Sequence, residues 1–198
     1  MLEDQPVQRI TSSEVVTQLE RIPIDQQLFT LLKKHTNPSE EEIKPLIDQG
    51  FDLNCVDENG LTPFLYLIQK KLNTRDNPSL LEFIQFLIEN GINVYCEDNN
   101  GCNVLHPLCS NYRNENLIDI IRLLIKKGID VYCRGHCGWN VLICLCQNSE
   151  NENLIDIIRL LIENEFEVTS ETLNYFTTFY NKGNRDEVLH LLEKVVCT

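Results

Sequence analysis

The chain has 198 residues, and 42% of them are hydrophobic, which is enough for a folded domain with a sizeable core. The net charge is −13, with the excess acid in residues 1–58 and 150–198, while residues 59–149 carry 8 acidic and 8 basic side chains. Nucleic-acid binding needs a basic stripe, so we expect no nucleic-acid partner. No run approaches the roughly 20 apolar residues of a membrane helix, so we expect no membrane partner.

The N-terminal sequence MLEDQPVQRI lacks the basic start and apolar core of a secretory signal peptide. The chain contains nine cysteines, an odd number that argues against a framework of disulfides. We therefore expect free thiols in a reducing compartment. The cytoplasm is the expected location, with the nucleus as the alternative.

The first elements in chain order are a tail and two helices. Residues 1–23 are expected to form a frayed tail with one short helix. A helix is predicted over residues 24–34, and Ser39 with Glu42 forms a capping-box pattern ahead of the next helix. Pro45 lies inside that second helix and predicts that it is shortened or kinked.

An internal repeat governs the rest of the chain. The sequence NENLIDIIRLLI occurs at residues 114–125 and again at residues 151–162, an offset of 37. The blocks GCNVLHPLC from Gly101 and GWNVLICLC from Gly138 share this offset, and GLTPFLYLI from Gly60 is a copy 41 residues earlier. A fixed period of this size is typical of solenoids, in which each unit stacks on the next.

Each unit predicts a hairpin, a short helix, a loop and a long helix, in that order. Apolar residues follow helical spacing over residues 117–125, and Gly128 supplies the left-handed residue that ends this helix. The β-prone stretch IDVYC and a polar turn then predict a hairpin. Asn140 is the expected N-cap of the next short helix, and Asn103 and Thr62 hold the same place in their units.

This order resembles the ankyrin repeat, whose pattern is D-x-x-G-x-T-P-L-H, two helices and G-A-D-V-N-A. Residues 57–65, DENGLTPFL, match best, and residues 98–106, DNNGCNVLH, keep the Asp, Gly, Leu and His. The units exceed the usual length of about 33 residues because the loops between the two helices are longer. Glu165 also replaces the helix-ending glycine of the last hairpin. The resemblance implies an all-α ankyrin-repeat solenoid of about five helix pairs with short β-hairpin fingers.

The resemblance also divides the chain into a tail, residues 1–23, and a repeat domain, residues 24–198. Within the domain we expect an N-terminal capping repeat, three central repeats and a C-terminal capping repeat over residues 24–59, 60–100, 101–137, 138–169 and 170–198. In the last of these, Ser170 is the expected N-cap of one helix, and Asn184 with Glu187 opens the final helix.

Motifs of catalysis are missing from the sequence, which has no phosphate-binding loop, GxSxG or HExxH. We therefore expect no enzyme and no cofactor. Zinc binding is a remote alternative, because residues 133–146 contain CRGHC and CLC, with suitable ligands at suitable spacing. However, Cys55, Cys96 and Cys133 hold one equivalent position in three units, where a small apolar thiol would suit tight stacking. The resemblance likewise gives His106 a structural hydrogen bond to the neighbouring loop.

The resemblance implies protein binding on a concave face built from finger tips and short helices. We expect a binding scaffold or adaptor. The alternative is an inhibitor similar to the IκB-type ankyrin proteins, which would use acidic surface to mask a basic segment of its partner. The acidic ends also fit a simpler role, which is to keep the stack of repeats soluble.

Trp139 is the leading candidate binding residue, because Trp and Tyr dominate interface hot spots and this tip position is variable in the family. The alternative is that Trp139 folds back onto the stack. We expect Leu61, Cys102 and Trp139 to form an apolar row along the stack. The other candidates on tips and short helices are Asn59, Asn100, His136, Gln69, Lys70, Asn111 and Asn148.

Tyr95 and Tyr132 replace the family's asparagine in adjacent hairpins, so we expect them to neighbour one another. Two interpretations stay open at this point. They form a second aromatic patch for binding, or they pack between repeats.

Overall fold

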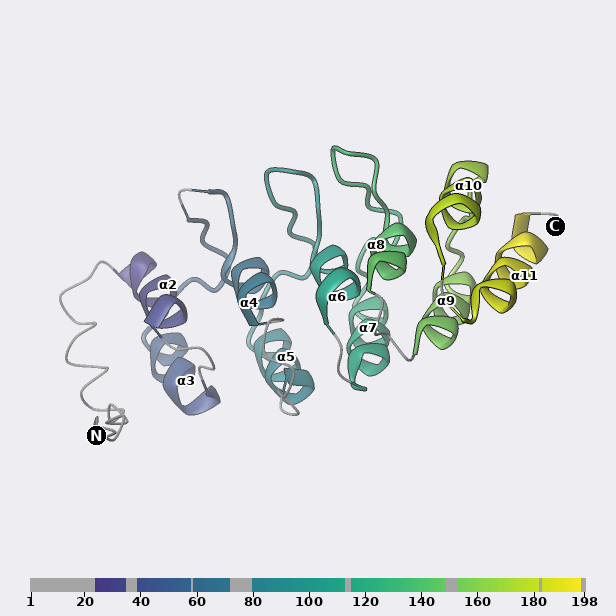
Figure 1. Cartoon of the computed structure of the whole chain (residues 1–198). Helices are drawn as coiled ribbons and strands as arrows, with labels where there is room; N and C mark the ends of the chain where they lie inside the picture. Colours follow the sequence, from purple (N-terminus) through teal and green to yellow (C-terminus); the bar gives the residue numbers. More distant parts are fainter. Residues whose placement is uncertain are drawn as a thin grey trace, which may run out of the picture.

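The structure is a computed structural model that describes residues 24–34, 39–57, 59–71, 80–112, 115–148, 153–181 and 183–196. The predicted tail, residues 1–23, lies outside the described residues. Figure 1 shows the described helices in two rows. The first row holds α2 (Ile24–Lys34), α4 (Pro63–Lys71), α6 (Leu105–Asn111), α8 (Val141–Gln147) and α10 (Ser170–Phe179). The second row holds α3 (Glu40–Asp48), α5 (Leu80–Glu89), α7 (Leu117–Lys126), α9 (Leu154–Glu163) and α11 (Arg185–Val196).

Contacts between neighbouring helices build the molecule. Along the first row, α2 contacts α4, α4 contacts α6, α6 contacts α8, and α8 contacts α10. Along the second row, α5 contacts α7 and α7 contacts α9, while α6 also contacts α7 across the rows. Each unit therefore touches the units next to it, which is the architecture of an all-α repeat solenoid. No helix in the described ranges is long and apolar enough to cross a bilayer.

The repeated twelve-residue sequence forms α7 and α9, and its apolar side explains why both helices are stable where they are. In α7, Leu117, Ile120, Ile121 and Leu124 recur at helical spacing and are fully buried. The polar side of α7 faces out, where Arg122 Nη1 lies 2.6 Å from Asp119 Oδ1. The copy in α9 buries its leucines and isoleucines in the same way. The core is thus a continuous layer between the two rows.

Three long loops lead into α4, α6 and α8, and Figure 1 shows them projecting beyond the first row of helices. We name them the first, second and third finger loops, residues 50–62, 91–104 and 128–140. The described residues contain no β-strand and one isolated antiparallel β-bridge, between Glu97 and Asn103. The predicted β-hairpins are thus turns without an extended ladder.

Helix starts test the sequence prediction closely. Ser39 forms the predicted capping box, with its backbone N–H donating to Glu42 Oε2 at 2.8 Å. Asn140 is the N-cap of α8, and its Oδ1 accepts from the Ile143 N–H at 3.0 Å. The prediction for Ser170 is wrong by one residue: Thr169 has the extended backbone of an N-cap, and Ser170 is already helical. Pro45 lies inside α3, which continues to Asp48.

Left-handed residues end the second-row helices. Gly50, Gly91 and Gly128 have φ angles of 83°, 88° and 85°, a region that glycine enters without steric cost. Glu165 takes the same place after α9 with φ of 66°, and its side chain makes this conformation costly.

Replacing Glu165 by glycine is therefore expected to raise the free energy of unfolding by up to about 1 kcal/mol, measured by denaturant titration. The reciprocal change Gly91→Glu is the matched control. A Cβ on Gly91 meets no atom within 4 Å, so its cost is purely conformational, and this variant should lose about 1–2 kcal/mol. Loss of stability in Glu165→Gly would contradict this account.

Candidate functional site

The turns at the tips of the finger loops are held by one aspartate each in the first two loops. Asp57 Oδ1 accepts backbone N–H groups from Asn59 and Leu61, each at 2.9 Å. Asp98 does the same in the second loop. The third loop has Gly135 at this position, and backbone bonds alone close its turn, with Gly135 N–H donating to Trp139 O at 3.0 Å.

Hydrogen bonds join each tip to the one before it. Asn99 Nδ2 donates to Asn59 O in the preceding loop at 2.5 Å. His136 N–H donates to Asn100 O at 2.7 Å. The three tips therefore form a continuous band in which the backbone of each finger loop is fixed by its neighbour.

The three residues of the predicted apolar row occupy one equivalent place in this band. Leu61 O, Cys102 O and Trp139 O each accept the N–H of the residue four positions earlier, at 3.0, 2.9 and 3.0 Å. Leu61 and Cys102 are half-buried, and Leu61 packs against the core. Trp139 keeps 40% of its surface exposed. A binding role for the row stays a prediction.

His106 fixes the backbone of Trp139. The imidazole is buried, with Nε2 lying 3.1 Å from Trp139 O and Nδ1 lying 3.2 Å from Asn103 Oδ1. The ring thereby ties α6 to the third finger loop, which is the structural role that the family resemblance implied. The sequence did not indicate that this bond holds the candidate binding residue Trp139.

The candidates on the short helices differ in exposure. Asn111 is exposed, and Gln69 Nε2 donates to Asp98 Oδ2 at 3.4 Å. Asn148 is buried, at 3% exposure, and its Nδ2 donates to Tyr112 O at 2.7 Å. Its expected place on the binding face is therefore corrected, because the amide is used to hold the end of α6. The side chain of Lys70 lies outside the described residues.

Tyr95 and Tyr132 each reach forward to the end of the next second-row helix. Tyr95 Oη donates to Lys127 O at 2.9 Å, and Tyr132 Oη donates to Glu165 O at 2.6 Å. The Tyr132 ring also stacks on Phe166, with centroids 6.1 Å apart and planes 4° apart. These contacts favour packing between repeats over a joint aromatic patch, although 64% of Tyr95 and 47% of Tyr132 remain exposed.

The described cysteines include candidate ligands of the zinc site that the sequence offers as an alternative. In the part of the chain that the structure describes, no three His, Cys, Asp or Glu side chains are placed to hold a metal ion. The eight cysteines described there are free thiols. Burial raises the pKa of Cys96, Cys109, Cys144 and Cys146, so these groups stay protonated and are poor ligands or nucleophiles.

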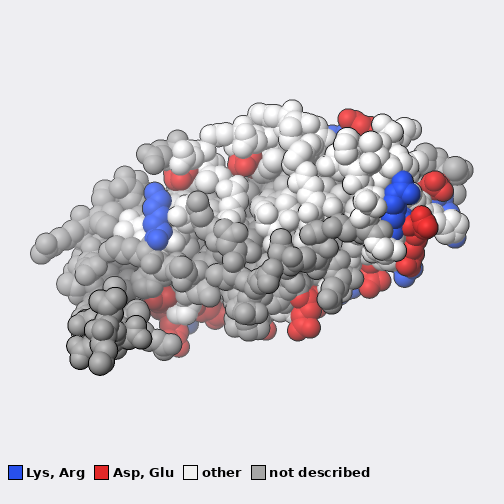
Figure 2. Space-filling view, in the orientation of Figure 1, with Lys and Arg blue, Asp and Glu red and all other residues white. Residues whose placement is uncertain are grey.

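Charge separates the two sides of the solenoid. The sequences of α6, LHPLCSN, and α8, VLICLCQ, contain no Asp, Glu, Lys or Arg. Figure 2 shows a broad area without charge in the upper middle, over the first row and its loops, and acidic side chains along the lower edge, over the second row. The uncharged part of this side thus centres on α6 and α8, while the finger loops carry charged residues such as Glu97, Asp98 and Arg134.

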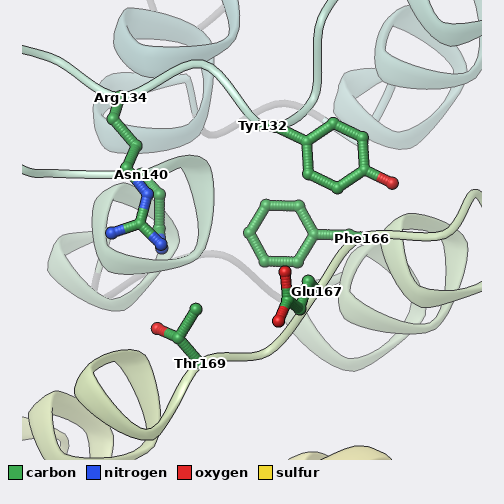
Figure 3. Close-up of a pocket in the computed structure, with 6 residues that line it drawn as sticks. All are labelled: Tyr132, Arg134, Asn140, Phe166, Glu167 and Thr169. Carbon is green, nitrogen blue, oxygen red and sulfur yellow. The ribbon is translucent and has the colours of Figure 1, made fainter.

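A pocket of about 170 Å³ lies between the third finger loop and the link that leads into α10, and sequence reasoning missed it. Figure 3 shows its lining residues, Tyr132, Arg134, Asn140, Phe166, Glu167 and Thr169. The sequence feature that could have indicated the pocket is the short link between α9 and α10, residues 164–169, which is shorter than any of the three finger loops. No fourth finger loop exists there to cover the third.

Tyr132→Phe is expected to lower the free energy of unfolding by about 0.5–1 kcal/mol, because it removes one hydrogen bond and keeps the ring on Phe166. Tyr175→Phe is the matched control, since no described residue bonds to the Tyr175 hydroxyl. Denaturant unfolding measures both. If the two variants are equally stable, the Tyr132 hydrogen bond does not stabilise the fold, and Tyr132 becomes a candidate for partner binding.

The family model for ankyrin repeats, in three copies, matches residues 34–133 and residues 73–172. These segments hold the three finger loops and the helices from α3 to α9. No curated protein matches the chain. The matched segments cover more than half of the sequence, and the structure is an all-α solenoid of the corresponding repeats, so the chain belongs to the ankyrin-repeat family.

Proposed function

We propose that the chain is a binding scaffold or adaptor that holds a partner protein on the face formed by the three finger loops and by α4, α6 and α8. Ankyrin repeats generally mediate protein–protein interaction, so the class of ligand follows from the family. The proposal includes the absence of catalysis and a location in the cytoplasm, with the nucleus as the alternative. It also treats the ten described helices as five pairs, with the finger loops as fingers and residues 24–198 as one repeat domain.

The observation that carries the proposal is a half-exposed tryptophan on a fixed backbone. Trp139 O accepts from Gly135 N–H at 3.0 Å and lies 3.1 Å from His106 Nε2, while 40% of the residue stays exposed. A loop whose backbone is held this way loses little further backbone freedom on binding, and such ordering is one of the costs of association. Trp139 is therefore suited to act as the central anchor of an interface.

Exposed uncharged polar side chains lie on the same finger tips and short helices. Asn59, Asn100 and His136 are exposed at the tips, and Gln147 and Asn111 are exposed at the ends of the short helices. Amide side chains offer both donors and acceptors without the desolvation cost of a charge. Such side chains are typical of the polar rim of a protein interface.

Trp139→Ala is expected to weaken partner binding at least about tenfold, because truncating a hot-spot aromatic costs about 2 kcal/mol or more. Its free energy of unfolding should fall by only about 1 kcal/mol, since the side chain is far from fully buried. Partners captured from lysate by the full chain are identified by mass spectrometry, and their affinities are then measured with purified proteins.

Phe179→Ala is the matched control, because Phe179 is an aromatic residue of α10 with 68% exposure and lies outside the finger loops. It should bind the partner like the unsubstituted chain. If Trp139→Ala loses several kcal/mol of stability, Trp139 belongs to the core. If neither binding nor stability changes, the anchor lies elsewhere on the chain.

Salt dependence separates the scaffold from the IκB-like inhibitor. Binding centred on Trp139 and on the uncharged helices α6 and α8 should change by less than about twofold between roughly 50 and 300 mM salt, because few ion pairs are screened. An inhibitor that masks a basic segment with acidic surface would lose affinity steeply over this range, mainly through a slower association rate. Surface plasmon resonance at several salt concentrations gives both quantities.

A further inference from the structure

Two thiols, those of Cys102 and Cys137, lie near Gly135, which takes the place that an aspartate has in the other two finger loops. A Cβ built on Gly135 would lie 2.7 Å from Cys102 Sγ and 3.7 Å from Cys137 Sγ. The two sulfur atoms can therefore be no farther apart than the sum of these distances. A side chain at position 135, such as the aspartate that the other two loops have there, would force the sulfur of Cys102 to move.

The pair is also held in place and open to solvent. His136 N–H donates to Asn100 O at 2.7 Å, which fixes the two finger loops side by side next to the thiols. Cys137 is exposed and Cys102 is half-buried. The two neighbouring thiols are shielded from solvent. Cys133 is buried and its Sγ donates to Gly101 O at 3.1 Å, and Cys144 is 2% exposed.

We propose that Cys102 and Cys137 form a modification site for low-molecular-weight disulfides such as glutathione disulfide, which convert the two thiols into one disulfide between the second and third finger loops. The inference does not rest on the proposed binding function. Disulfides in a reducing compartment are usually transient and regulatory, which fits a pair at the surface rather than one in the core.

Exposure decides the order of the two steps. The thiolate of Cys137 attacks one sulfur of glutathione disulfide, which forms a mixed disulfide and releases one glutathione thiolate that takes up a proton. Cys102 then loses its proton to solvent and attacks the Cys137 sulfur, which forms the protein disulfide and expels the second glutathione. Two protein thiols lose two electrons, and one glutathione disulfide gains them.

Cys102 acts second because it is the weaker nucleophile at neutral pH. Burial, followed by the negative charge of Asp98, raises the pKa of Cys102 to about 12, so little thiolate is present. The closing step is therefore slow in solution but is aided by the short distance between the sulfurs. It should accelerate as pH rises toward the pKa of Cys102.

The test uses the full chain, reduced and then incubated with glutathione disulfide, with intact mass and peptide mapping as readouts. The unsubstituted chain should lose two thiols without gaining glutathione, and the peptides that hold Cys102 and Cys137 should be linked. Cys102→Ser should keep one glutathione on Cys137. Cys137→Ser should show neither change, and Cys55→Ser, which removes a half-buried thiol of the first finger loop, should behave like the unsubstituted chain.

Three results would overturn the proposal. These are stable glutathione on Cys137 of the unsubstituted chain, a disulfide that uses other cysteines, and no reaction at all. The unsubstituted chain alone shows whether the disulfide between Cys102 and Cys137 forms. The proposal therefore stays testable even if Cys102→Ser does not fold. In that event Cys102→Ala serves as the second variant, with the same expected glutathione adduct.

Discussion

Burial of apolar side chains between neighbouring units is the interaction on which the rest of the structure depends. A single unit cannot bury its apolar surface alone. The short helices α4, α6 and α8 each have apolar sides that are covered by the helices before and after them in the row. In α8, all residues from Val141 to Cys146 are buried, against α6 on one side and α10 on the other. Nearest-neighbour burial of this kind makes stability a sum over adjacent units.

The base of each finger loop is part of this core, with Phe51, Val94 and Val131 buried in it, while polar contacts fix the tips of the loops. Aspartates close the first two turns, tip-to-tip bonds join the loops, and His106 ties the third loop to α6. The result is a surface whose backbone is rigid although it contains no regular sheet. A fixed backbone is what a binding face needs if specificity is to come from shape and amide contacts.

The sequence predicted the parts of this molecule that depend on local chemistry and on the repeat. Asn140 and Ser39 lie where capping rules place them, and the twelve-residue repeat predicted α7 and α9 and their buried side. Contacts between units were harder to predict from the sequence. Asn148 is buried by the end of α6, and Cys102 approaches Cys137 through the space above Gly135, and neither follows from spacing along the chain. The sequence shows that the link between α9 and α10 is short, but it does not show how this link packs beside the third finger loop to leave a pocket.

The asparagine–glycine pairs at the first two tips bear on how the protein ages. Asn-Gly sequences deamidate when the glycine nitrogen attacks the asparagine side chain, and the product carries a new negative charge. Here Gly60 N–H donates to Asp57 O at 3.0 Å and Gly101 N–H donates to Asp98 O at 2.9 Å, so both nitrogens are engaged inside closed turns. The lifetime of Asn59 and Asn100 is therefore set by how often these turns open, and each opening that ends in reaction adds a second acid beside the aspartate that closes the turn.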